Sequence, residues 1–144
     1  MKGILRGLAA SLFSAVAFSS SGVADTTVLS PAEQLAKVQV FSLGFNGFVG
    51  HISEGERLMK TIAAQGNARE IFMNIASSPA SSPEAKLYAA CALEKAGYSV
   101  PDALFATQYA TDVSMLRADI LSKQNFKATL LALKNSVCRS GHAD

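Results

Sequence analysis

Apolar residues recur at helical spacing over most of this chain, and residues 82–97 show the pattern with both ends defined. Ser82 is a favourable N-cap, because its hydroxyl can accept a hydrogen bond from a free backbone N–H of the first turn. Pro83 suits the first helical position, and Gly97 is a typical residue just past a last turn. The sequence therefore predicts a helix between these residues.

The same segment has an apolar face made of small and medium side chains. Leu87, Ala90 and Cys91 follow one another at helical spacing, while Lys86 and Lys95 are expected to point elsewhere. We expect neighbouring helices to pack closely against this face, so residues 82–97 are predicted to be the centre of the fold.

Other segments carry similar start signals with short connections between them. We predict an all-α fold, a compact orthogonal or antiparallel bundle of about five to six short helices. The stacked helices are similar to HEAT repeats, although their spacing is too irregular to predict a solenoid. Residues 111–121 fit neither period and are left open as loop, strand or helix. The predicted helices begin after Ser30, Ser53, Asn67 and Pro101, and the last spans 123–137 with Ser122 as its cap.

The first 24 residues have the layout of a secretory signal peptide. Lys2 and Arg6 precede an apolar run, and small residues at Gly22 and Ala24 suit cleavage before Asp25. Cleavage after Ala17 is a weaker alternative. The apolar run is shorter than the roughly 20 residues of a membrane-spanning helix, so no stable membrane insertion is expected. We expect a periplasmic protein with one helical domain over residues 25–144.

Removal of this leader changes the charge balance. Without Lys2 and Arg6, the 13 basic residues fall to 11, which equals the 11 acidic residues. A neutral chain without a block of Lys or Arg attracts phosphate backbones weakly, so nucleic-acid binding is not expected.

Cys91 and Cys138 are the two cysteines of the chain. Both lie at apolar positions in a chain predicted to enter an oxidising compartment, so we expect a disulfide between them. Two buried free thiols are the alternative. A catalytic or metal-binding pair is disfavoured, because the chain has neither Cys-x-x-Cys nor a cysteine–histidine cluster. We predict no metal and no cofactor.

Residues 43–51 combine three glycines with aromatic side chains. They lack the lysine of a phosphate-binding loop, so a tight turn near Asn46 and Gly47 is predicted. Phe45 and Phe48 have two interpretations, either packing in the core or contacting a partner. We place the candidate partner-binding surface on residues 43–53, with six candidate contact residues: Phe45, Asn46, Phe48, His51, Ser53 and Glu54.

One dense polar cluster offers a catalytic alternative. His51, Ser53, Glu54 and Glu56 could act on a substrate or bind a cation. Against this, Ser53 and Glu56 occupy capping-box positions, and metal sites usually collect more ligands.

Two stretches of the sequence occur together in a recognisable pattern. Residues 50–56 read G-x-x-S-x-G-E, residues 87–93 read L-Y-A-x-C-x-L, and Cys138 follows near the end. This pattern resembles small secreted bacterial α-helical domains, mostly uncharacterised. The match covers residues 50–93 and Cys138, and Ala92 stands where the pattern has a glycine. The resemblance implies a helical fold and assigns no catalytic residue.

Export, small size, a disulfide and the lack of a catalytic constellation favour a protein-binding function. We expect an immunity or inhibitor protein that blocks a secreted cell-wall-attacking toxin enzyme. The alternatives are a small cell-envelope hydrolase using the His51, Ser53, Glu54 and Glu56 cluster, or a structural scaffold subunit. The sequence leaves the oligomeric state open.

Overall fold

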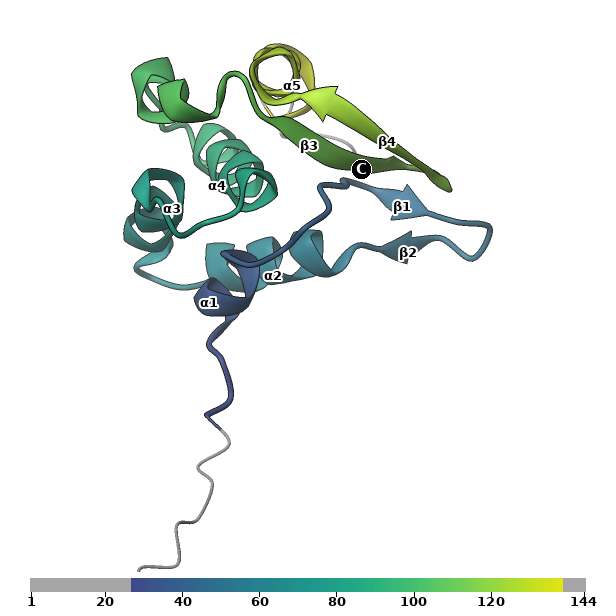
Figure 1. Cartoon of the computed structure of the whole chain (residues 1–144). Coiled ribbons are helices and arrows are strands. Elements are labelled where there is room, and N and C mark those ends of the chain that lie inside the picture. Colours follow the sequence, from purple (N-terminus) through teal and green to yellow (C-terminus); the bar gives the residue numbers. More distant parts are fainter. Residues whose placement is uncertain (1–26, 139–144) are drawn as a thin grey trace, which may run out of the picture.

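The computed structural model describes residues 27–138 and shows a mixed α/β architecture in which helices pack around a central helix and two β-hairpins project from one side (Figure 1). In chain order the elements are α1 (Pro31–Leu35), β1 (Phe45–Asn46), β2 (His51–Ile52), α2 (Glu54–Ala63), α3 (Ala68–Ser77), α4 (Pro83–Lys95), the 3-10 helix η1 (Asp102–Gln108), β3 (Asp112–Arg117), β4 (Ile120–Asn125), α5 (Phe126–Ala132) and the π-helical turn η2 (Leu133–Val137).

Helix α4 is the centre of the structure, as the sequence predicts. The Ser82 hydroxyl accepts a hydrogen bond from the Ala85 amide at 3.0 Å, and Gly97 follows the helix with a φ of +82°. All residues from Glu84 to Leu93 are buried, because α2, α3, α5 and β3 all contact this helix. Such a helix has no solvent-facing side along most of its length.

Lys86 therefore departs from the prediction that it points away from the core. It is 3% exposed, and burial lowers the pKa of its ammonium group. Glu84 is buried on the same helix, and its carboxylate accepts a hydrogen bond from the Ser114 amide of β3 at 2.8 Å. Helical periodicity alone could not predict these burials, because they depend on elements that approach α4 from several sides.

The all-α prediction, including the HEAT-like arrangement, is wrong, because the structure contains two antiparallel hairpins. Strand β1 pairs with β2, with Phe45 opposite Ile52. Strand β3 pairs with β4 from Asp112 opposite Asn125 to Arg117 opposite Ile120. Within β3, Val113 and Met115 are buried in alternation with more exposed neighbours, which is the period of a strand.

The missed elements explain two further corrections. The last helix, predicted to span 123–137, begins at Phe126, because residues up to Asn125 continue β4 and the Asn125 side chain caps α5. The first helix ends at Leu35. Beyond it, Phe41 lies in an extended segment that pairs in parallel with Met115 of β3. The helix predicted to begin after Ser30 is therefore short, and the chain that follows it is extended.

The predicted disulfide is confirmed. Cys91 of α4 is bonded to Cys138, with the two Cα atoms 5.0 Å apart, and both side chains are buried. The bond ties the end of η2 to the central helix. The predicted leader, its cleavage site before Asp25 and residues 139–144 lie outside the described residues.

Candidate binding surface

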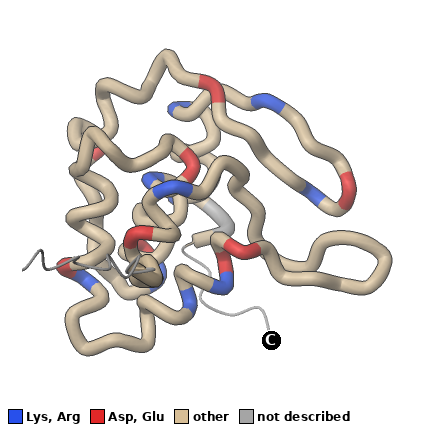
Figure 2. Tube along the Cα trace, turned by 60° about the horizontal axis from the view of Figure 1, so that its bottom comes forward, with Lys and Arg blue, Asp and Glu red and all other residues tan. Residues whose placement is uncertain are grey.

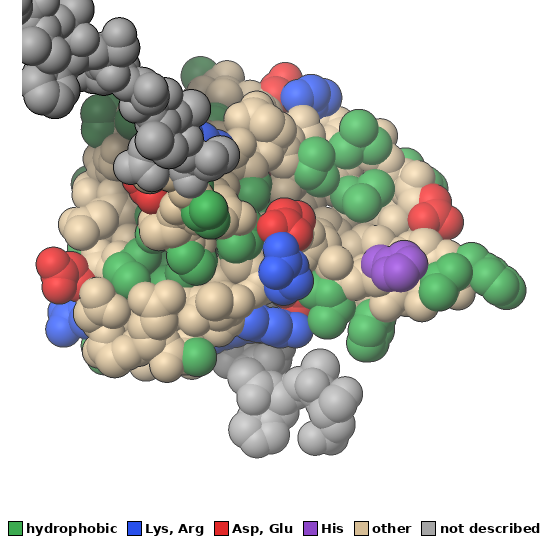
Figure 3. Space-filling view, turned by 90° about the horizontal axis from the view of Figure 1, so that it is seen from below, with side chains coloured by type: hydrophobic (Ala, Val, Ile, Leu, Met, Phe, Trp, Pro, Cys, Tyr) green, Lys and Arg blue, Asp and Glu red, His purple; other side chains and the backbone are tan. Residues whose placement is uncertain are grey.

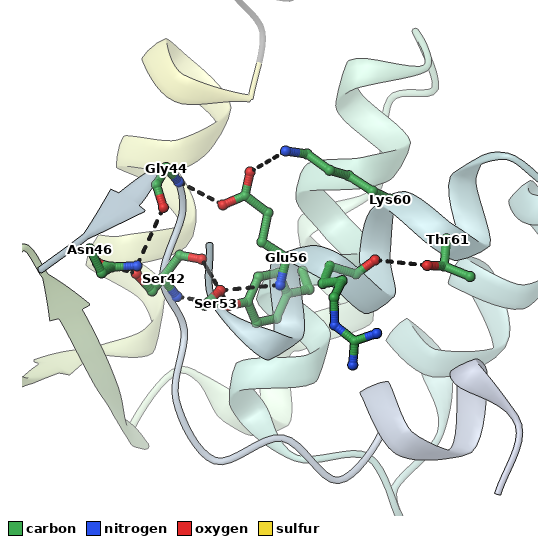
Figure 4. Close-up of polar contacts among 9 residues, drawn as sticks. Ser42, Gly44, Asn46, Ser53, Glu56, Lys60 and Thr61 are labelled. Carbon is green, nitrogen blue, oxygen red and sulfur yellow. Dashed lines mark hydrogen bonds and ion pairs between the residues drawn. The ribbon is translucent and has the colours of Figure 1, made fainter. Parts of the chain in front are cut away.

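A buried network of hydrogen bonds fixes the base of the β1–β2 hairpin (Figure 4). The Tyr88 hydroxyl on α4 accepts a hydrogen bond from the Ser42 amide and donates one to the Ser42 carbonyl, both at 2.8 Å. The Ser53 hydroxyl lies 3.0 Å from the Tyr88 hydroxyl and donates to the same carbonyl at 2.8 Å. Both chain segments that form the hairpin are therefore attached to the central helix.

Glu56 adds a second attachment from α2. One of its carboxylate oxygens accepts a hydrogen bond from the Gly44 amide at 2.6 Å, and the other pairs with Lys60 at 2.9 Å. The Glu56 side chain is buried whereas that of Lys60 is largely exposed. Because the carboxylate has partners for both oxygens, its burial costs less than that of an isolated charge.

The two sequence motifs meet in this network. Ser53, Gly55 and Glu56 belong to the first motif, and Tyr88 belongs to the second. The Ser53 hydroxyl lies 3.0 Å from the Tyr88 hydroxyl, and a Cβ atom on Gly55 would lie 2.5 Å from Tyr88 Cζ. The glycine is needed because the tyrosine ring occupies the space of any side chain at that position. Residues of the two stretches are therefore in direct contact in the structure.

Burial raises the pKa of Tyr88, and the hydrogen bonds from Ser53 and Ser42 act in the opposite direction. The neutral phenol is the form that donates to the Ser42 carbonyl. The site therefore favours the protonated tyrosine, which is a structural role for its hydroxyl.

Asn46, a predicted contact residue, belongs to the base of the hairpin. Its side-chain oxygen accepts a hydrogen bond from the Ser42 hydroxyl at 2.9 Å, and its amide nitrogen donates to the Gly44 carbonyl at 3.3 Å. It is buried, so it stabilises the shape of the hairpin and has little surface to offer a partner.

Beyond this base the hairpin exposes apolar side chains. Phe45 is 76% exposed and Phe48 is fully exposed at the turn, so the structure places both outside the core. Val49 and Ile52 are exposed beside them. Figure 3 shows apolar side chains on either side of His51 and out to the end of the projection. Several exposed apolar side chains on one projecting hairpin are typical of a contact surface.

The hairpin also lacks charge. Residues 38–53 contain no Lys, Arg, Asp or Glu, and Figure 2 shows the β1–β2 loop without a charged position beside the charged β3–β4 hairpin. A partner could therefore bind this segment without removing water from a Lys, Arg, Asp or Glu side chain of the segment.

The end of the second hairpin touches the first. A Cβ atom on Gly47 would lie 3.3 Å from a carboxylate oxygen of Asp119, in the turn between β3 and β4. Ile120 and Leu121 follow that turn and are 72% and 63% exposed. The sequence reasoning missed these two residues, because residues 111–121 had no assigned structure. Their position directly after a polar turn was the feature of the sequence that could have indicated two exposed apolar side chains.

The four residues of the predicted catalytic cluster do not converge. Ser53 is engaged at the hairpin base, and Glu56 pairs with Lys60. Glu54 bonds to Arg57 at 2.5 Å on the exposed side of α2, and His51 is exposed on β2. A hollow of about 230 Å³ lies between α2, α3 and α4, under Arg69 and Tyr98, and none of the four residues lines it.

Two other kinds of feature are missing from residues 27–138. No three His, Cys, Asp or Glu side chains gather there in a group that could hold a metal ion. Helices long and apolar enough to cross a bilayer are also lacking in this part of the chain.

Comparison of the chain with protein-family models, curated proteins and solved structures found no match.

Proposed function

We propose that this protein is a periplasmic binding domain that inhibits a secreted cell-wall-attacking enzyme by inserting the β1–β2 hairpin into its active-site cleft. The observation that carries the proposal is the fully exposed Phe48 at the turn of an uncharged hairpin whose base is held by buried hydrogen bonds.

The shape of the hairpin indicates the kind of partner surface. The exposed Phe45, Phe48 and Val49 belong to the narrow β1–β2 hairpin that projects from the fold (Figure 1). They therefore fit a concave site better than a flat one. Clefts lined with apolar and aromatic side chains are the usual concave sites of proteins, and most of them are substrate or ligand sites. Occupation of such a site by the hairpin would exclude the substrate.

The rigidity of the base favours tight binding. Loops that are ordered before association lose less conformational freedom when they bind. Tyr88 and Glu56 hold the entry to β1, while Asn46 orders the loop itself. Aromatic side chains near the centre of an interface commonly supply most of the binding free energy. Phe48 and Phe45 are therefore the expected anchors, with exposed His51 and Glu54 at the polar rim.

The compartment completes the proposal. The predicted leader would bring the protein to the periplasm, where enzymes that attack the cell wall act, and the Cys91–Cys138 bond suits an oxidising environment. The dispersed positions of His51, Ser53, Glu54 and Glu56 do not support the hydrolase alternative.

Inhibition of peptidoglycan hydrolysis tests the proposal. The disulfide-bonded protein is mixed with a purified muramidase, an amidase and an endopeptidase, and dye release from labelled peptidoglycan is measured. We expect stoichiometric inhibition of one class, weakened at least about tenfold by Phe48→Ser, as for loss of an aromatic anchor.

Val28→Ser is the matched control, because Val28 is also exposed but precedes α1. It should leave the inhibition unchanged. Inhibition of none of the three enzymes, or equal inhibition by the Phe48→Ser variant, would contradict the proposal. Sequencing of the N-terminus of protein from a periplasmic fraction tests the export step, with Asp25 expected as the first residue.

A further inference from the structure

Strand β3 has its two edges occupied in different ways. One edge pairs with β4. On the other, the Phe41 amide donates to the Ser114 carbonyl at 2.8 Å, and the Leu116 amide donates to the Phe41 carbonyl at 2.9 Å. The Ser114 carbonyl and the Leu116 amide therefore point away from β4.

This orientation fixes the direction of the backbone groups in β4. Ser114 lies opposite Lys123, and Leu116 lies opposite Leu121. In an antiparallel ladder, residues whose backbone groups point away from each other form the non-hydrogen-bonded pairs. The N–H and C=O groups of Lys123 and Leu121 therefore point outward, along the free edge of β4.

Within residues 27–138 no hydrogen bond is made to these four outward groups. The edge also lacks the usual protection, because β4 is a regular six-residue strand without proline. Its one lysine, Lys123, does not extend over the edge, since its Nζ atom donates to the Ser114 hydroxyl of β3 at 2.7 Å. Asn125 ends the usable edge, because its carbonyl already accepts a hydrogen bond from the Thr129 hydroxyl.

We infer that the β4 edge pairs with the β4 edge of a second copy of this chain, antiparallel about a two-fold axis at Ser122. In this register Leu121 of each copy lies opposite Lys123 of the other. Each such pair exchanges two backbone hydrogen bonds, so all four outward groups of each copy find a partner. A self-complementary edge of this kind is the condition for a two-fold interface.

The neighbouring two-fold registers of the same edge are less favourable, because they bring like charges together or leave backbone groups without partners. Centring the axis on Lys123 puts two ammonium groups opposite each other, which is unfavourable, and would need the occupied carbonyl of Asn125. Centring it on Leu121 leaves the backbone groups of Lys123 near the end of the overlap. The register centred on Ser122 has neither defect.

The side chains fit this arrangement. Leu121, 63% exposed in the single chain, becomes a diagonal neighbour of Leu121 of the second copy, and such neighbours are within reach of large side chains. Ile120 lies opposite Gln124 of the second copy. Exposed apolar surface at the turn is thereby covered.

Dimer formation goes beyond the proposed inhibitory function and is compatible with it. The segment that leads into β1 lies on the Phe41 side of β3, opposite the β4 edge. Pairing through β4 therefore leaves both β1–β2 hairpins free, and a dimer would carry two of them.

Cysteine crosslinking of the disulfide-bonded protein tests the register. Ser122→Cys places two thiols in a non-hydrogen-bonded pair with Cα atoms about 4.5 Å apart, within the range of a disulfide. We expect a covalent dimer after mild oxidation. Gln124→Cys is the matched control on the same strand and face, and should not crosslink with itself. A mixture of Ile120→Cys and Gln124→Cys should form a mixed dimer.

Sedimentation velocity over a range of concentrations tests the edge itself. Lys123→Pro removes an outward N–H while leaving the bonds to β3, and it should weaken the dimer about thirtyfold through two lost hydrogen bonds per dimer. Lys123→Thr keeps the backbone group and should still dimerise. Circular dichroism checks that both variants fold. If Lys123→Pro does not fold, the crosslinking experiment still tests the register.

A monomeric protein at all concentrations, without a crosslink from Ser122→Cys, would overturn the inference. So would equal crosslinking by Gln124→Cys alone, or a dimer that the folded Lys123→Pro variant forms as tightly as the wild type, because either result would place the contact elsewhere.

Discussion

Tyr88 on α4 exchanges two hydrogen bonds, each 2.8 Å long, with the backbone of Ser42, a residue 46 positions earlier in the chain. Through them a central helix orders the base of a surface hairpin. Tyr88→Phe keeps the ring packed against Phe41 but leaves the buried Ser42 amide without its partner. We expect the free energy of unfolding to fall by about 1–3 kcal/mol, measured by urea denaturation. Tyr98→Phe, at an exposed position, should change it little, and an equal loss in both variants would refute this role.

The raised pKa of Tyr88 predicts a pH dependence. Its ordinary value is 10.0, and burial raises it in the folded state. Above pH 10 the unfolded chain loses this proton before the folded protein does, so ionisation stabilises the unfolded state. The stability contributed by Tyr88 is complete below pH 10 and is lost as pH rises through the folded pKa. Unfolding measured against pH should show the difference between wild type and Tyr88→Phe narrowing in alkali. A constant difference would show that the two pKa values are the same.

Gly55→Ala tests the contact between the two motifs. The new Cβ atom would lie 2.5 Å from Tyr88 Cζ, so α2 and α4 would have to separate. We expect a loss of about 1–3 kcal/mol or more in the free energy of unfolding. Gly66→Ala is the control, because no atom lies within 4 Å of that position. Thermal denaturation of the two variants should differ clearly, and similar melting temperatures would argue against close packing at Gly55.

Reduction of the Cys91–Cys138 bond should destabilise the protein strongly. The bond closes a loop between residues separated by 47 positions, which on the chain-entropy model is worth about 4 kcal/mol. Denaturation with and without reductant measures this difference. The double variant Cys91→Ala with Cys138→Ala should behave like the reduced protein and be insensitive to reductant. A stability independent of reductant in the wild type would contradict the prediction.

Ala118→Gly should stabilise the β3–β4 hairpin. Ala118 has a φ of +52° in the turn, a conformation that costs a side chain about 1 kcal/mol and glycine little. The free energy of unfolding is expected to rise by up to about 1 kcal/mol. Part of this gain is offset, because glycine gives the unfolded chain more conformational entropy than alanine does. Chemical denaturation measures it. Asp119→Gly, whose residue has no positive φ, serves as the comparison and should not stabilise.

Sequence reasoning succeeded where the determining interaction is local. The hydroxyls of Ser30, Ser53 and Ser82 each accept a hydrogen bond from the amide three residues later, as predicted from residue type and spacing. The Cys91–Cys138 pairing was predicted from the presence of two cysteines in a chain that we expect to enter an oxidising compartment.

It failed where pairing is distant or the turn is unusual. Strand β3 is supported by Phe41, far away in sequence, and its turn at Ala118 and Asp119 lacks the glycine that signals a hairpin. The exposure of Phe45 and Phe48 also depends on neighbours that periodicity does not reveal. Tyr88 looked like an ordinary apolar position of a helix, although a buried tyrosine requires a hydrogen-bond partner, and that requirement was the available signal.

The hydrogen bond between the Gly44 amide and the buried Glu56 carboxylate has a kinetic consequence. A loop already shaped by such a bond can be captured at first encounter, without waiting for a rearrangement. Association should then proceed in one phase, whose rate rises linearly with partner concentration. The lifetime of the proposed complex would then depend mainly on how fast Phe48 leaves the partner's cleft.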